Sequence, residues 1–380
     1  MPTQTPDPNG PTILDLEQTF LDNNFGRIND NIDQLQRMSQ ISPSSSAYGT
    51  SFYGINHRQT PSPLSINKDF YGLAFFTRPC MNMRRENIGT YRQLMPLTST
   101  NERSVQRIIR SYFDYRLFLE QGIGCPFVNP NQAFIAPLTN HLQSMNGWPD
   151  IVAQTFTSHE GAHKESYGFV DGNLAADYQN FDLSCTFRNL TGDPITTLFY
   201  YWLRYQEGVF MGEITPYIDH IFNNEIDYQT RVYRVILDST KTVVQKIAAT
   251  GICFPENSPL GASFDFDARS EPINRGNDQI TINFKCFGAT YLDDILVDEF
   301  NRTVQLFQPL MRADRRDSYF TKIPMGALSV FNCDGYPNIN PDTYELEWYI
   351  ENEIWQYWFP VVQSKASFDQ DLITGMYPTR

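Results

Sequence analysis

Apolar and polar residues alternate most regularly between residues 181 and 293. The segment opens with a strand pattern, Phe181–Phe187, in which every second residue is apolar. Asp193 and Pro194 follow as an acidic N-cap and a first-turn proline. The aromatic helix that they start is expected to end at Gly208, because glycine suits a helix C-cap. Further strands are expected at 231–237, 243–254 and 280–287.

The first 64 residues carry an amphipathic helix pattern on a polar tether. Between residues 13 and 38, apolar side chains recur at spacings of seven, four, three, four and three, which resembles a heptad seam. A Ser/Pro/Gly-rich stretch, 39–65, separates this helix from the body. Packing on its own domain is one interpretation; docking on a neighbouring subunit is the other, and the loose tether favours it. The candidate interface residues of this seam are Leu21, Phe25, Ile28, Ile32 and Leu35.

The pattern is less regular between residues 65 and 180. A long helix is expected over 100–121, with Ser99 and Glu102 as a capping box and Gly122 at its end. The polar stretch 158–177 is expected to be a loop. The other elements expected here are a strand over 70–77, a short helix over 137–145 and a strand over 151–157.

After residue 293, a helix is expected over 294–307 and an aromatic cluster follows. Trp348, Trp355 and Trp358 are three of the five tryptophans in the chain. They fit a packed core as well as an interface anchor, since tryptophan is enriched in binding hot spots, and we assign them as candidate interface residues. The predicted fold class is α+β and β-rich. The predicted parts are an N-terminal arm and tether (1–64), a first β/α part (65–180), a β core (181–293) and a C-terminal extension (294–380).

Composition and charge narrow the function classes. The net charge of −14 argues against a DNA-binding face, which needs a basic patch. No apolar run approaches the roughly 20 residues that span a bilayer, and the N-terminus lacks a secretory signal pattern. The six cysteines are widely spaced, without a C-x-x-C pair. We interpret them as reduced residues of a protein folded in a cytoplasm, with Cys185, Cys253 and Cys286 inside apolar strands.

One motif matches a known catalytic pattern. His159-Glu160-Gly161-Ala162-His163 has the form H-E-x-x-H, which on a helix binds zinc through both histidines and uses the glutamate as a base. The flanking residues are polar, and a glycine inside a helix costs about 1 kcal/mol. A zinc hydrolase using His159, Glu160 and His163 is therefore an alternative, and a polar loop is the preferred interpretation. We assign no catalytic, metal-binding or cofactor-binding residue.

The order of elements over 181–293 resembles the tail tube proteins of contractile-tailed bacteriophages, including the tube-like proteins of the baseplate. Those chains show a strand, a short turn, an aromatic helix, two strands, a Gly-x-x-Pro-x-Asn step, an alternating strand and a last strand. Here Gly251 and Pro255 form the step with one extra residue between them, and Ser263–Asp267 is the alternating strand. Thr77-Arg78-Pro79 and Asn82 are also similar to a Thr-Arg-Pro-x-x-Asn pattern in virion proteins of large phages.

The resemblance implies a flattened β-sandwich or barrel with a flanking helix, associated as a hexameric ring with a β-lined channel. Ring closure would remove exposed sheet edges, and a lumen lined with acids would repel DNA during ejection. The implied partners are copies of the chain itself, neighbouring tail, sheath or baseplate proteins, and passing phage DNA without specific binding.

The extra parts at both ends favour a baseplate, tube-initiating or tube-end position in the virion over that of a repeating tube subunit. No cofactor is implied. A monomeric β-rich module that binds a host or a carbohydrate through the tryptophan cluster is a further alternative.

Overall fold

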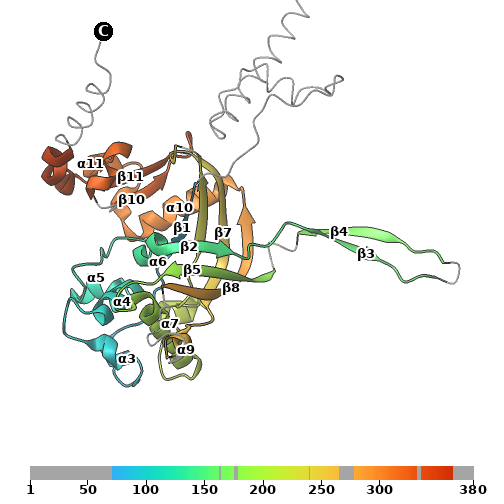
Figure 1. The fold of residues 1–380 in the computed structure, drawn as a ribbon, viewed down its shortest axis with the longest axis horizontal. Helices are drawn as coiled ribbons and strands as arrows, with labels where there is room; N and C mark the ends of the chain where they lie inside the picture. Colours follow the sequence, from blue (N-terminus) through green and yellow to red (C-terminus); the bar gives the residue numbers. More distant parts are fainter. Residues whose placement is uncertain are drawn as a thin grey trace, which may run out of the picture.

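The structure, a computed structural model, describes residues 71–161, 164–174, 179–238, 240–264, 278–331 and 335–362. Its centre is one large antiparallel sheet of six strands (Figure 1). These strands are β1 (Tyr71–Phe76), β2 (Leu142–Asn146), β5 (Asn180–Arg188), β6 (Val232–Leu237), β7 (Val244–Pro255) and β8 (Gln279–Tyr291). Their order across the sheet is β1-β6-β7-β8-β5-β2. The 181–293 segment therefore supplies the central strands, and the preceding segment supplies both edges.

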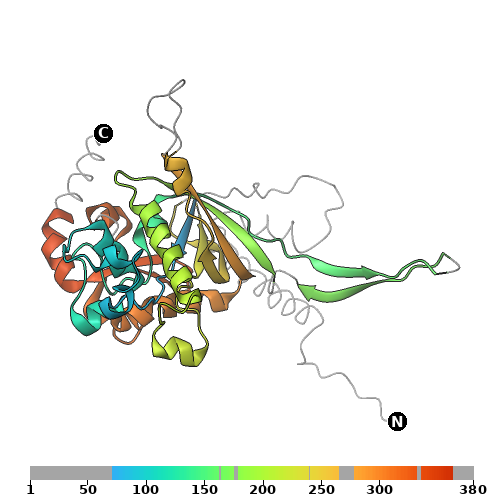
Figure 2. The ribbon, with the colours of Figure 1, turned by 90° about the horizontal axis from the view of Figure 1, so that it is seen from below.

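Two smaller β-structures accompany the main sheet. The strands β9 (Phe320–Lys322), β10 (Tyr336–Ile339) and β11 (Leu346–Glu351) form a sheet in the order β10-β11-β9. The strands β3 (Ala153–Thr157) and β4 (Gly168–Leu174) pair only with each other in the described structure. In Figures 1 and 2 this hairpin projects from the body as a long arm.

Helices cover parts of both faces of the main sheet. The named helices are α3 (Arg85–Ile88), α4 (Val105–Phe113), α5 (Arg116–Gln121), α6 (Ala136–His141), α7 (Pro194–Phe210), α8 (Ile218–Asn223), α9 (Leu260–Phe264), α10 (Asp294–Phe307) and α11 (Arg316–Tyr319). Short 3₁₀ helices occupy Met95–Thr98, Pro309–Met311 and Met325–Phe331, and residues 352–362 are helical. Helices α7 and α10 lie on opposite sides of the sheet.

Each of these two helices closes a hydrophobic layer against the sheet. On one face, Phe187 of β5 packs beside Phe199 of α7, and both are fully buried. On the other face, Phe75 of β1 and Tyr233 of β6 meet Phe300 of α10 edge to face. Burying one such aromatic side chain stabilises the fold by about 1.5–3 kcal/mol. The two layers hold α7 and α10 to the sheet.

The elements predicted over 181–293 are confirmed in their order, with β5, α7, β6, β7 and β8 at the expected places. The predicted end of α7 is wrong. The helix continues to Phe210. Gly208 instead packs against Ile214, where a Cβ at Gly208 would lie 2.3 Å from Ile214 Cδ1. At the other end, Asp193 has φ +49° and accepts a hydrogen bond from Asn189 Nδ2 at 2.5 Å, without capping a helical N–H. Gly208 is thus required by packing.

Gly208→Ala is expected to lower the free energy of unfolding by about 1–3 kcal/mol, the usual effect of overpacking a core. Alanine favours a helix by about 1 kcal/mol over glycine, but the new methyl group would displace Ile214. Urea denaturation would measure the change. The control is Phe210→Ala at the exposed end of the same helix, where Phe210 is 92% exposed. An unchanged midpoint in Gly208→Ala would show that Ile214 moves aside freely.

The long helix expected in the first β/α part is two helices. Asp114 separates α4 from α5 with an extended backbone, and its carboxylate accepts hydrogen bonds from the Met83 N–H (2.9 Å) and Tyr217 Oη (2.7 Å). Burial raises the pKa of Asp114. The capping box predicted at Ser99 is also wrong, because Ser104 caps α4 through its side chain. Contacts from distant segments decide where this helix breaks.

Several segments expected to be irregular contain regular elements. The predicted loop 158–177 includes β4, and α8 lies in the stretch between α7 and β6 where no element was predicted. The short helix predicted over 137–145 is α6 followed directly by β2. The predicted strand Ser263–Asp267 begins inside α9, and residues 265–277 lie outside the described structure. Pairing of β2 with β5 and of β3 with β4 explains two of these differences.

The predicted β-rich α+β class is confirmed at this coarse level. In the described residues the main sheet is open, with β1 and β2 as its two edges, so no closed barrel is formed. The expectation that all cysteines are reduced is wrong for one pair, since Cys253 and Cys286 form a disulfide. They face each other in β7 and β8 with Cα atoms 4.3 Å apart, the spacing of a pair without ladder hydrogen bonds. Cys185 is free and fully buried, as expected of a core residue.

Candidate functional site

The arm formed by β3, β4 and their flanking residues (151–174) carries exposed apolar side chains. Tyr167 is 69% exposed and Phe169 is 61% exposed. Phe156 and Phe169 stack on each other at 5.6 Å between ring centroids, but none of the arm's described side chains belongs to a hydrophobic cluster of the body. A two-stranded hairpin alone is marginally stable in water. The arm is therefore suited to contact another molecule.

Half of the main sheet presents a polar face on the side of α10. That helix packs over β7 and β10 and leaves the outward side chains of β5 and β8 exposed or half-exposed. Lys285 Nζ pairs with Asp182 Oδ1 at 2.7 Å, and this bond raises the pKa of Lys285. We call this surface the open face. Its outward residues on β5 and β8 are Asn180, Asp182, Ser184, Thr186, Arg188, Gln279, Thr281, Asn283, Lys285 and the exposed Phe287.

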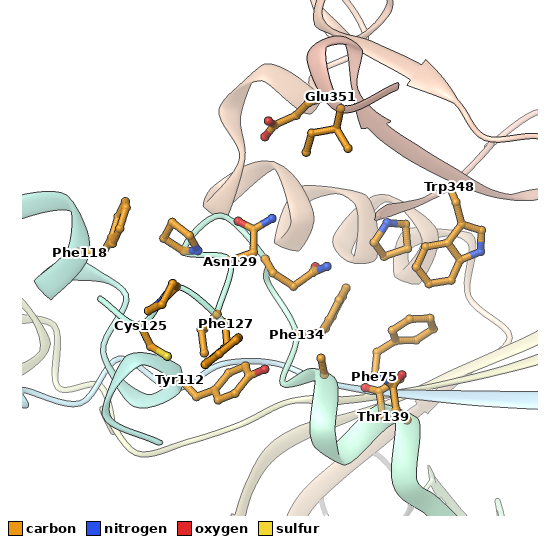
Figure 3. Close-up of a pocket in the computed structure, with 18 residues that line it drawn as sticks. Phe75, Tyr112, Phe118, Cys125, Phe127, Asn129, Phe134, Thr139, Trp348 and Glu351 are labelled. Atoms are coloured by element: carbon orange, nitrogen blue, oxygen red, sulfur yellow. The ribbon is translucent and has the colours of Figure 1, made fainter. Parts of the chain in front are cut away.

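A cavity of about 590 Å³ lies between the first β/α part and the C-terminal sheet (Figure 3). Phe118 and Phe127 stand on one side of it, and Phe75 and Trp348 stand on the other (Figure 3). Phe127 is 63% exposed. We call this cavity the aromatic cleft. Six of the 18 residues that line it are aromatic, and such side chains favour binding through apolar burial.

Buried Arg78 holds one wall of this cleft in place. Its guanidinium donates to five backbone carbonyl oxygens at 2.5–3.2 Å. The acceptors are Ser111, Tyr112, Asn129, Pro130 and Gln132. Burial lowers the pKa of Arg78 to about 10. The Thr-Arg-Pro pattern in the sequence therefore marks a structural contact between the end of β1 and the cleft wall.

The structure brings the three predicted tryptophans together. Trp348 lies in β11 and lines the aromatic cleft, while Trp355 and Trp358 lie in the helical segment 352–362. All three pack against one small cluster, and Trp355 stacks on Phe331 at 5.5 Å. Their interface role stays a prediction. The N-terminal seam of Leu21, Phe25, Ile28, Ile32 and Leu35 lies outside the described residues.

The described residues of the H-E-x-x-H motif, His159, Glu160 and Gly161, do not lie on a helix. His159 and Glu160 are exposed in the connection between β3 and β4, and His163 lies outside the described residues. A hairpin connection does not supply the helical spacing that the zinc pattern requires. In the part of the chain that the structure describes, no group of three His, Cys, Asp or Glu side chains is placed to hold a metal. The same part has no helix with both the length and the apolar content of a membrane span.

Comparison with known proteins gives one match over most of the chain. The family model described as "Putative phage tail tube protein" matches residues 14–368. No curated protein matches.

Three solved structures are similar over part of the fold. The tube-terminating cap of the anti-feeding prophage is 15% identical, and the match covers 42% of this chain and 82% of that chain with a TM-score of 0.26. The sheath/tube terminator of the extracellular contractile injection system PVC in its extended state is 14% identical, with 40% of this chain and 85% of that chain covered and a TM-score of 0.23. The PVC sheath-tube complex in its extended state is 16% identical, with 42% and 82% covered and a TM-score of 0.26. They cover less than half of this chain, so the assignment rests on the family match. The chain belongs to the phage tail tube protein family.

Proposed function

We propose that this protein is a structural subunit of a phage tail that assembles with copies of itself into a ring around the DNA channel. Membership in the tail tube family carries this proposal. The open main sheet supports it, because its two edge strands have no outer strand partner in the described chain. An unpaired sheet edge is a template for pairing with another chain, and a closed ring of copies would satisfy it.

The open face is the surface that we assign to the channel. Apart from Phe287 its outward residues on β5 and β8 are polar, and its charges are balanced: Asp182 and nearby Glu256 oppose Arg188 and Lys285. A balanced polar surface offers no run of cations for phosphate binding. DNA would then pass without specific binding because the surface lacks a basic patch. A lumen lined with acids, which the sequence analysis expects, is not needed.

We assign the β3–β4 arm to contact between copies. Its exposed aromatic residues, Phe156, Tyr167 and Phe169, would gain burial against a neighbouring subunit. The partners are other copies and neighbouring tail, sheath or baseplate proteins, and the location is the virion tail. A baseplate, tube-initiating or tube-end position fits the parts outside the 181–293 core. The role is structural and non-enzymatic.

A host- or carbohydrate-binding module is less well supported. Trp348, Trp355 and Trp358 pack on their own chain. Size-exclusion chromatography with light scattering on the full chain tests the proposal. We expect a defined oligomer, six copies in the hexameric version of the proposal. A monomer at every protein and salt concentration would contradict it.

Deleting residues 1–64 is expected to leave the body folded and to weaken assembly at least about tenfold in concentration, equal to about 1.4 kcal/mol. The reason is the predicted seam at 13–38, which would dock on a neighbouring subunit through its apolar side. Circular dichroism would follow folding, and sedimentation velocity would follow assembly. A matched control replaces the tether residues 39–65 with a Gly/Ser linker of equal length. If the truncated chain failed to fold, the interpretation of residues 39–65 as a tether outside the folded body would be wrong.

A further inference from the structure

The aromatic cleft is a cavity that the described part of the chain leaves accessible. Phe118 and Phe127, on one of its walls, are both exposed, and so is Ile354. Phe127 belongs to none of the hydrophobic clusters of the described body. A cavity of about 590 Å³ lies in the size range of pockets that bury a bound group. The cleft is therefore suited to receive apolar side chains from outside the body.

One polar group of the cleft wall awaits a hydrogen-bond partner. Thr139 Oγ1 is buried and has no partner among the described residues. The nearby amides are already used, because Asn129 Nδ2 donates to Tyr336 Oη at 2.8 Å and Gln132 Nε2 donates to Gly335 O at 2.9 Å. A buried polar group without a partner is unfavourable. The cleft therefore favours an aromatic occupant that brings one hydroxyl over a sugar, whose several hydroxyls would need further partners.

The β3–β4 arm carries side chains of this kind. Phe156, Tyr167 and Phe169 are each roughly half exposed or more. Since a buried aromatic side chain covers 150–250 Å², covering the exposed parts of these three would bury about 250–450 Å² on the arm. Each partner of a standard protein interface buries about 800 Å². The arm would thus supply about half of a contact between copies, and other surfaces would supply the rest.

The arm and the cleft lie on opposite sides of the body. In Figures 1 and 2, β3 and β4 project from one side, while α5 and β11 lie on the other. These two elements carry Phe118 and Trp348, which line the cleft. An arm in this position does not reach the cleft of its own chain. A projection on one side and a cavity on the opposite side are the two halves of a head-to-tail contact, which repeats from copy to copy and can close a ring.

We propose that the aromatic cleft binds the β3–β4 arm of a neighbouring copy. This inference rests on the proposed function, which assigns the arm to contact between copies and leaves the receiving surface unnamed. The stacked pair Phe156 and Phe169 enters the cleft beside Phe127 and is removed from water. Tyr167 lies two residues before Phe169, on the same side of an extended chain, and supplies the hydroxyl that pairs with Thr139 Oγ1.

Photo-crosslinking on the full chain tests this contact. One preparation carries p-benzoylphenylalanine in place of Phe127, and it is mixed with isotope-labelled unmodified chain before illumination. We expect crosslinks from position 127 to residues 151–174 of the labelled copy. Their yield should be at least tenfold above that of the matched control, which carries the photoreactive residue in place of the exposed Phe210 on α7. Crosslinks from position 127 to other segments of the labelled copy, without 151–174, would overturn the proposal.

A double-mutant cycle shows whether cleft and arm form the same contact. Phe127→Ser should raise the concentration needed for assembly at least tenfold, measured by sedimentation velocity, while the far-ultraviolet spectrum stays constant. Adding Phe127→Ser to the variant Phe156→Ser with Phe169→Ser should change its assembly by less than about twofold, because the contact is already lost. If the two effects multiplied instead, the cleft and the arm would act in separate contacts, and the proposal would be wrong.

The outcomes separate this inference from the proposed function. Normal assembly of Phe127→Ser, with no crosslink from position 127 into the arm, would overturn the cleft contact and leave the ring of copies standing. A full chain that stays monomeric at every concentration would overturn both.

Discussion

Removing the β3–β4 arm is expected to leave a folded body that no longer assembles. Replacing residues 151–174 with a short Gly/Ser linker deletes no member of the hydrophobic clusters. The melting temperature of the body should therefore change by only about 2–4 °C, the effect of about 1 kcal/mol or less. The concentration needed for assembly should rise by at least about a hundredfold, equal to about 2.7 kcal/mol, because the arm is the contact that we assign to neighbouring copies.

A double substitution tests the arm without deletion. Phe156→Ser with Phe169→Ser removes the stacked pair at its exposed surface. Phe210→Ser is the matched control, since Phe210 is an exposed aromatic residue on α7, outside the arm. Sedimentation velocity across a concentration series would give the assembly state. Normal assembly of both arm variants would exclude the arm as a contact between copies.

Arg78→Met is expected to be the most destabilising single substitution proposed here. Methionine matches much of the length of arginine but donates no hydrogen bond, so the five carbonyl oxygens would lose the Arg78 donors. Each buried carbonyl oxygen that is left without a donor costs about 1–3 kcal/mol. Urea denaturation would measure the loss, and Arg85→Met, at an exposed arginine, is the control.

Arg78→Lys separates charge from geometry. A lysine keeps the positive charge but has one ammonium group with three donors, whereas arginine has five in a planar fork. We expect Arg78→Lys to lower the free energy of unfolding, but by less than Arg78→Met does. If Arg78→Lys matched the unmodified protein, charge would be the only requirement at this position. If Arg78→Met were as stable as the control, the buried network would not hold the cleft wall.

The sequence predicted the elements whose pattern depends on one buried face. The alternation of Phe181–Phe187 and the aromatic stripe of α7 both follow from burial against the same layer, in which Phe187 meets Phe199. Their positions were therefore readable without tertiary information. The break between α4 and α5 was not, because it depends on hydrogen bonds from Met83 and Tyr217 to Asp114.

The arm and the disulfide show what local pattern cannot predict. Of the arm, the strand predicted over 151–157 is confirmed as β3, but the polar pattern of 158–177 predicts a loop and misses β4. Cys253 and Cys286 lie 33 residues apart, and only the register of β7 against β8 places them opposite each other. Of the candidate site, the sequence singled out Trp348, which lines the aromatic cleft, but not the cleft itself, which exists only once the first β/α part and the C-terminal sheet flank the same cavity.

Cryo-electron microscopy of assemblies of the purified full chain tests the central claim most directly. The account predicts a ring of copies in which Asp182, Thr281 and Lys285 of the open face line the channel. It also predicts that each arm reaches a neighbouring copy. A monomer under all conditions would contradict the account, and so would a ring in which the open face points away from the channel.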